Sequence, residues 1–70
     1  MIHFYLNKNE QGNGDHEVHR GTCSRLPDIN NREYLGFFNT SSEAIAQARA
    51  MHPFWRIDGC YYCCPENHKS

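Results

Sequence analysis

The four cysteines of this 70-residue chain constrain its fold more than any other feature. Three of them lie in the segment GCYYCC, residues 59–64, and the fourth, Cys23, lies far upstream. A chain this short buries only about 60% of the surface that its unfolded form exposes, so its hydrophobic core is thin. Small domains compensate with disulfides, a metal ion or a partner subunit. The cysteines are therefore expected to hold this fold together.

The spacing of the cysteines favours a metal site. Cys60 and Cys63 form a CxxC pair, and His19 and Cys23 form an HxxxC pair. Zinc takes four nitrogen or sulfur ligands in a tetrahedron, which two short chelating loops from distant parts of a chain can supply. We therefore predict one structural Zn²⁺ bound by His19, Cys23, Cys60 and Cys63. Four protein ligands leave no position for a catalytic water, so the chain is not expected to be an enzyme.

Several alternatives to this ligand set stay open. Cys64 could replace Cys63 as a ligand, although a free buried Cys64 would also pack well as a small apolar side chain. His68 could replace His19. His16 is expected to be a surface or hairpin residue, because on a strand it points to the opposite face from His19. Two alternatives without this metal site remain: a domain stapled by disulfides, and a thiol-based redox protein with a reactive Cys64.

Alternating apolar residues predict the strands of a small sheet. Residues 2–7 alternate with the period of a strand that has one buried face. A loop rich in Gly and Asn, residues 9–15, leads to a second strand at 16–20 and so predicts a hairpin. A third strand is expected at residues 33–38, where Gly36 indicates a bulge or a close approach of another chain segment.

The clearest predicted element is a helix that begins after Thr40. Thr40 can cap the first free amides, while Glu43 can reach back to the amide of the cap residue. Pro53 disfavours helix at the residue before it, so the helix should end near Met51. The apolar positions repeat at helical spacing and should face the core; they are Ala44, Ile45, Ala48 and Met51.

Together these elements predict a single α+β domain over residues 1–70. It has a three-stranded antiparallel sheet, one helix packed across the sheet, and a C-terminal CxxC knuckle tied to the end of the hairpin. A short apolar segment at residues 54–57 is expected to lead from the helix back to the cysteines.

The charge of the chain bears on its partners. Seven Lys and Arg stand against eight Asp and Glu, a net charge of −1, and zinc with three thiolates would change it to about −2. Nucleic-acid binding is therefore not favoured, because it needs a local patch of cations. We expect a binding or adaptor module that presents Tyr61 and Tyr62 to a protein partner. Trp55 could serve the same purpose, although a role in covering the core is favoured for it.

The sequence also predicts a cytoplasmic location. It contains no charged segment followed by the apolar stretch of a secretory signal, and no apolar run near the ~18 residues of a membrane span. In a reducing cytosol cysteines bind metals more often than they form disulfides.

The order of the motifs resembles the zinc domain of the Ada DNA-repair protein and small zinc modules like it. The matching motifs are HxxxC at 19–23, LP at 26–27, NR at 31–32, SSEA at 41–44 and GCxxC at 59–63. Residues 18–65 also resemble a group of short, stand-alone, uncharacterised bacterial proteins. The resemblance implies a zinc module. In the Ada domain the first ligand of the upstream pair is a methyl-accepting cysteine, but His19 stands here, so methyl transfer is not implied.

Overall fold

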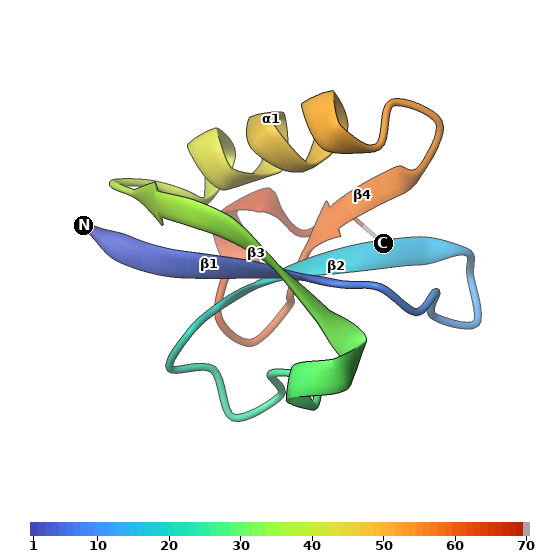
Figure 1. The fold of residues 1–70 in the computed structure, drawn as a ribbon, viewed down its shortest axis with the longest axis horizontal. Coiled ribbons are helices and arrows are strands. Elements are labelled where there is room, and N and C mark those ends of the chain that lie inside the picture. The colour runs from blue at the N-terminus through green and yellow to red at the C-terminus, as the bar shows by residue number, and fades with distance from the viewer. Residues whose placement is uncertain (70) are drawn as a thin grey trace.

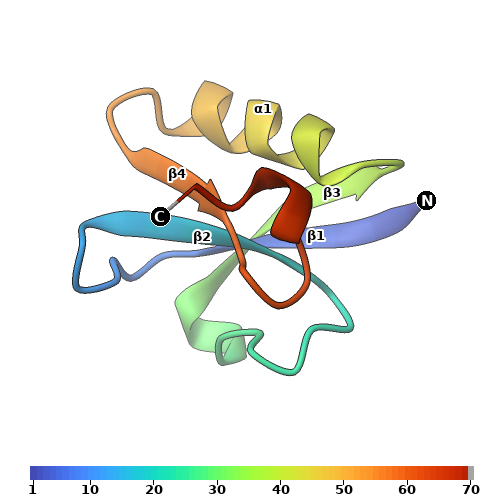
Figure 2. The same cartoon turned by 180° about the vertical axis from the view of Figure 1, so that it is seen from behind.

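The computed structural model describes residues 1–69 and contains one helix packed against a four-stranded sheet (Figure 1). The strand order in the sheet is β3-β1-β2-β4. Helix α1 contacts all four strands, and the short 3-10 turn η2 contacts α1 and β4 (Figure 2). The predicted α+β class is confirmed. In chain order the elements are β1 Ile2–Asn7, β2 Asp15–Arg20, η1 Ile29–Asn31, β3 Arg32–Phe38, α1 Ser41–Met51, β4 Arg56–Gly59 and η2 Pro65–Asn67.

The prediction of three antiparallel strands was wrong, because the sheet has a fourth strand and is mixed. β4 pairs in parallel with β2, so that His16 lies opposite Ile57 and Val18 lies opposite Gly59. Parallel strands need a long crossover connection, which β3 and α1 supply here. β4 is only four residues long, and Ile57 is its one large apolar residue. It therefore lacks the alternating pattern by which the other strands are recognised.

The hairpin and the bulge formed as predicted. β1 and β2 are antiparallel, with Leu6 opposite Val18, and Gly14 in the connecting loop has φ of +89°. β3 pairs with the other edge of β1. The register shifts between Phe4 and Tyr5 opposite Gly36, which has φ of +142° and confirms the irregularity expected there. Glycine adopts such backbone angles without a Cβ clash.

Helix α1 begins and ends where its local signals place it. The Thr40 hydroxyl accepts a hydrogen bond from the Glu43 amide at 3.3 Å, and the Glu43 carboxylate accepts one from the Thr40 amide at 3.1 Å. The helix ends at Met51. Its buried side chains are Ser41, Ala44, Ile45 and Ala48. Met51 was expected among them but is 37% exposed at the last helical residue.

The hydrophobic core lies between α1 and the sheet. It includes Cys64, which is fully buried and so packs as the free apolar thiol that the sequence allowed. The other buried members are Phe4, Leu6, Val18, Leu35, Ala44, Ile45 and Ala48. No helix in residues 1–69 has the length and apolar composition that a membrane crossing requires.

Trp55 is enclosed by two histidine rings. The His16 ring stacks on the indole at 3.8 Å between centroids, and the His52 ring stacks at 3.7 Å. Two rings cannot share one side of the indole at these distances, so the indole lies between them. His16 lies in the hairpin strand β2, one of the two positions expected for it, but it is not at the surface: it is 6% exposed because Trp55 covers it. Trp55 is partly buried and packs against the core, as favoured for it.

Candidate metal centre

The sheet brings the two predicted chelating pairs together. His19 lies near the end of β2 and Cys23 in the loop that follows, while Cys60 comes directly after β4 and Cys63 in the next turn. The parallel pairing of β2 with β4 continues through a hydrogen bond from the Cys60 amide to the Val18 carbonyl at 3.0 Å. This pairing places the knuckle beside His19.

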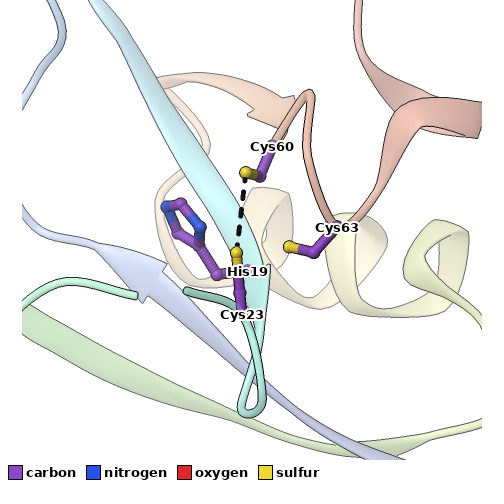
Figure 3. A group of neighbouring side chains, drawn as sticks. All are labelled: His19, Cys23, Cys60 and Cys63. Carbon is purple, nitrogen blue, oxygen red and sulfur yellow. Dashed lines mark hydrogen bonds between the residues drawn. The ribbon is translucent and has the colours of Figure 1, made fainter. Parts of the chain in front are cut away.

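The four side chains gather around one point (Figure 3). Each offers a ligand atom, and these atoms all lie within 4.8 Å of one another. The Cys23 and Cys60 sulfurs are 3.9 Å apart. Two sulfurs on a tetrahedral zinc, each about 2.3 Å from the ion, would be about 3.8 Å apart. The group of His19, Cys23, Cys60 and Cys63 could therefore hold one metal ion.

Backbone amides point at the sulfurs. The Arg20 amide donates to the Cys63 sulfur at 3.3 Å, and the Arg25 amide donates to the Cys23 sulfur at 3.4 Å. The backbone amides of Tyr62 and Cys63 in turn lower the pKa of the Cys60 thiol. Amide donors stabilise a thiolate more than a neutral thiol. These hydrogen bonds therefore favour the charged form that a metal binds.

The His19 imidazole has one unsatisfied nitrogen. The side chain is 2% exposed, and Nδ1 is the one buried side-chain nitrogen or oxygen in residues 1–69 without a hydrogen-bond partner. The other ring nitrogen, Nε2, lies 3.6 Å from the Glu17 carboxylate. An unpaired buried polar atom costs about 1–3 kcal/mol, and a metal ion on Nδ1 would remove that cost. Histidine ligands commonly present their second nitrogen to a carboxylate in this way.

Glu17 was missed at the sequence level, although a signal for it exists. Residues two apart on a strand point to the same face of the sheet, which places Glu17 beside His19. The spacing shows only that the side chains are neighbours. Which ring nitrogen faces the carboxylate depends on the rotamer of His19.

Burial controls the protonation of the possible ligands. It lowers the pKa of His19 from 6.5 to about 4, so the imidazole is neutral at pH 7 and can act as a ligand. Burial also raises the pKa of the Cys60 and Cys63 thiols, an effect that the amide donors oppose in part. The Cys60 and Cys63 thiols of the metal-free chain are therefore protonated at neutral pH. Metal binding would have to release these protons.

The remaining cysteine, Cys64, lies beside the group without belonging to it. Its sulfur is 3.7 Å from that of Cys63, and its side chain is fully buried. Burial raises the pKa of the Cys64 thiol, which disfavours the reactive thiolate. All four cysteines are free, because sulfur separations of 3.7 and 3.9 Å far exceed the ~2.05 Å of a disulfide.

The alternative ligand His68 is engaged elsewhere. Its Nδ1 donates to the Gly59 carbonyl at 2.9 Å and lies 3.3 Å from the Asp58 carboxylate. It is absent from the group of four whose ligand atoms converge. The geometry thus favours His19.

Two tyrosines project from the knuckle. Tyr61 is 62% exposed and Tyr62 is 61% exposed, and their rings meet edge to face at 5.3 Å. The Arg25 guanidinium lies 4.2 Å from the centroid of the Tyr62 ring. Aromatic side chains exposed to this degree are available to a partner.

Comparison of the chain with protein-family models, curated proteins and solved structures finds no match. The resemblance to the Ada zinc domain therefore stays a prediction. The centre is interpreted from its own geometry.

Proposed function

We propose that this chain is a small zinc-binding domain in which the ion has a structural role. Two observations carry the proposal: His19 Nδ1 is buried without a hydrogen-bond partner, and the ligand atoms of His19 and the three thiols all lie within 4.8 Å of one another. Three sulfurs and one imidazole nitrogen form a ligand set typical of structural zinc. The sulfur separation of 3.9 Å also suits the tetrahedral geometry of that ion.

The ion's structural role follows from the number and origin of the ligands. Four protein ligands complete a tetrahedron, so the ion would have no open position for a substrate or a reactive water. Two ligands come from β2 and its following loop, and two come from the knuckle after β4. Bound zinc would supply positive charge that holds these segments together. In a domain of this size, such a link compensates for a thin core.

The zinc domain is proposed to act as a binding or adaptor module. Tyr61 and Tyr62 lie between two ligands, so the ion would fix the backbone from which both rings project. A surface that is ordered before binding loses less entropy on association. The net charge of about −2 in the zinc-bound form favours a protein partner over a nucleic acid. A thiol-based activity is not proposed, because Cys64 is fully buried.

Metal analysis of the purified protein tests the proposal. Native mass spectrometry should find one zinc per chain, and chelation should abolish the far-UV circular dichroism of the fold. Restoring zinc should restore the signal. A metal-free protein that is fully ordered, or a sample in which the cysteines are linked to one another, would refute the structural zinc centre.

Isotope labelling identifies the nitrogen ligand. In protein loaded with ¹¹³Cd²⁺ as a spin-active substitute, His19 Nδ1 should show scalar coupling to the metal while Nε2 stays protonated. Coupling to Nε2, or to a nitrogen of His68, would contradict the geometry.

A further inference from the structure

A cavity of about 340 Å³ lies directly beside the metal centre. Its lining includes the ligands His19 and Cys60 together with Glu17, Arg25, Tyr61 and Tyr62. This volume falls at the lower end of the range for small-ligand pockets, about 300–1,000 Å³. The cavity is therefore large enough for one amino-acid side chain or one nucleotide, and its charge decides between them.

The lining contains one carboxylate, that of Glu17, with which no lysine or arginine of residues 1–69 forms an ion pair. The Glu17 side chain is 16% exposed, and its one ionic contact in residues 1–69 is the His19 imidazole at 3.6 Å. As a zinc ligand that imidazole would be neutral, because a metal binds histidine in its uncharged form. The adjacent zinc centre, with three thiolates and a neutral histidine, would add a net charge of about −1.

The tyrosines provide rings that attract a cation. The Arg25 guanidinium already lies 4.2 Å from the centre of the Tyr62 ring, within the ~6 Å range of a cation–π interaction. Tyr61 is equally exposed. The His68 ring lies edge-on at 5.4 Å from it, and no lysine or arginine of the described residues lies over it. Tyr61 could therefore offer a partner's cation the same contact that Tyr62 already makes with Arg25.

His68 adds no uncompensated positive charge to the cavity. Its Nδ1 faces the Gly59 carbonyl at 2.9 Å and the Asp58 carboxylate at 3.3 Å. Arg25 is consequently the one basic side chain of the lining whose charge has no carboxylate beside it, and its guanidinium is engaged by Tyr62.

We propose that this cavity binds the cationic side chain of an arginine or lysine from a protein partner, with Glu17 as the counter-ion and Tyr61 as the aromatic wall. The proposal rests on the zinc centre, which supplies part of the negative charge and orders the knuckle. The proposal specifies a cationic side chain as the group that the binding module recognises. A nucleotide would bring its phosphate towards Glu17 and a negatively charged centre.

An NMR titration of the zinc-loaded protein tests the cavity. The probe is N-acetyl-arginine N-methylamide, its neutral control is the citrulline analogue, and thymidine monophosphate represents nucleotides. The arginine probe should shift the resonances of Tyr61, Tyr62 and Glu17 in a saturable manner. The citrulline analogue should bind at least fivefold more weakly, because it lacks the charge that both contacts require.

Two charge variants make the test directional. Glu17→Gln removes the counter-ion and should weaken binding of the arginine probe about threefold. Arg25→Gln removes a charge of the same sign as the probe and frees the Tyr62 ring, so it should strengthen binding about twofold. A nucleotide site would respond with the opposite sign to both changes. Tyr34→Ala, at a 49% exposed tyrosine outside the cavity, is the matched control and should have no effect.

The possible outcomes separate this inference from the zinc proposal. Zinc content and the amide spectrum are measured on every sample. If Glu17→Gln disturbs the metal centre, Tyr61→Leu, at an exposed site, tests the cavity in its place. If the zinc-loaded protein does not bind the arginine probe, or binds the citrulline analogue equally well, the proposed cation site is refuted and the zinc centre is unaffected. Tighter binding of thymidine monophosphate overturns it in favour of a nucleotide. A protein without zinc overturns both proposals.

Discussion

Substituting serine at Cys60 and at Cys64 should have very different consequences, although the two sites are closely matched. Cys60 is 1% exposed and Cys64 is fully buried, and the chemical change from thiol to hydroxyl is the same. The cost of burying a hydroxyl is therefore similar in both variants. The difference between them measures the contribution of the metal.

The expected magnitudes follow from the role of each sulfur. At Cys64 the hydroxyl enters an apolar core, which costs about 1–2 kcal/mol and should lower the melting temperature by roughly 5–15 °C. At Cys60 a ligand is lost as well. Structural zinc stabilises small domains by about 10–16 kcal/mol, so even a quarter of that, roughly 3 kcal/mol, rivals what the core supplies. Cys60→Ser should thus be largely unfolded and bind zinc more than about 100-fold more weakly.

Thermal melts followed by circular dichroism, together with competition against a chromophoric zinc chelator, measure both effects. Cys64→Ser should retain one zinc per chain. If Cys64 were the ligand in place of Cys63, its serine variant would lose zinc as the Cys60 variant does. Equal losses of zinc affinity in the two variants would refute the assignment of the ligands.

Further predictions concern protons, the helix cap and a close backbone contact. Burial lowers the pKa of His19 to about 4, so between pH 6.5 and 4 the unfolded chain binds the proton more readily than the folded one. Acidification through this range should reduce stability by roughly 3 kcal/mol and release zinc; a urea midpoint independent of pH would contradict this. Thr40→Ala removes the hydroxyl that accepts from the Glu43 amide and should cost about 0.5–2 kcal/mol in a denaturant titration, with zinc content unchanged. Gly59→Ala would place a Cβ 2.9 Å from a backbone oxygen of the C-terminal turn and should cost about 1–3 kcal/mol, whereas Gly12→Ala, with no neighbour within 4 Å, should melt like the parent.

Features with local signals could be predicted from the sequence. The capping box at Thr40 and Glu43 fixes the start of α1, and Pro53 accounts for its end. The glycine-rich loop predicts the hairpin, and Gly36 predicts the bulge. The HxxxC and CxxC pairs each lie within one turn of chain, so their spacing alone indicates that each can chelate.

Features that depend on distant contacts could not be predicted in the same way. β4 forms because β2 offers it a free edge, and its own residues carry little strand pattern. His16 is buried because Trp55 and His52 arrive from later parts of the chain. The orientation of the His19 ring, which leaves Nδ1 unpaired, likewise depends on its neighbours in the folded sheet.

The enclosed indole gives this protein a built-in optical reporter. Trp55 is the only tryptophan of the chain, and the rings on its two sides come from β2 and from the C-terminal end of α1. Its emission should shift to longer wavelengths only when that three-ring stack opens to water. Because Trp55 is not among the residues at the metal centre, fluorescence can be recorded in parallel with absorption bands of Co²⁺ placed in that centre. The two signals together would reveal whether loss of the ion precedes, follows or coincides with separation of the final strand from the sheet.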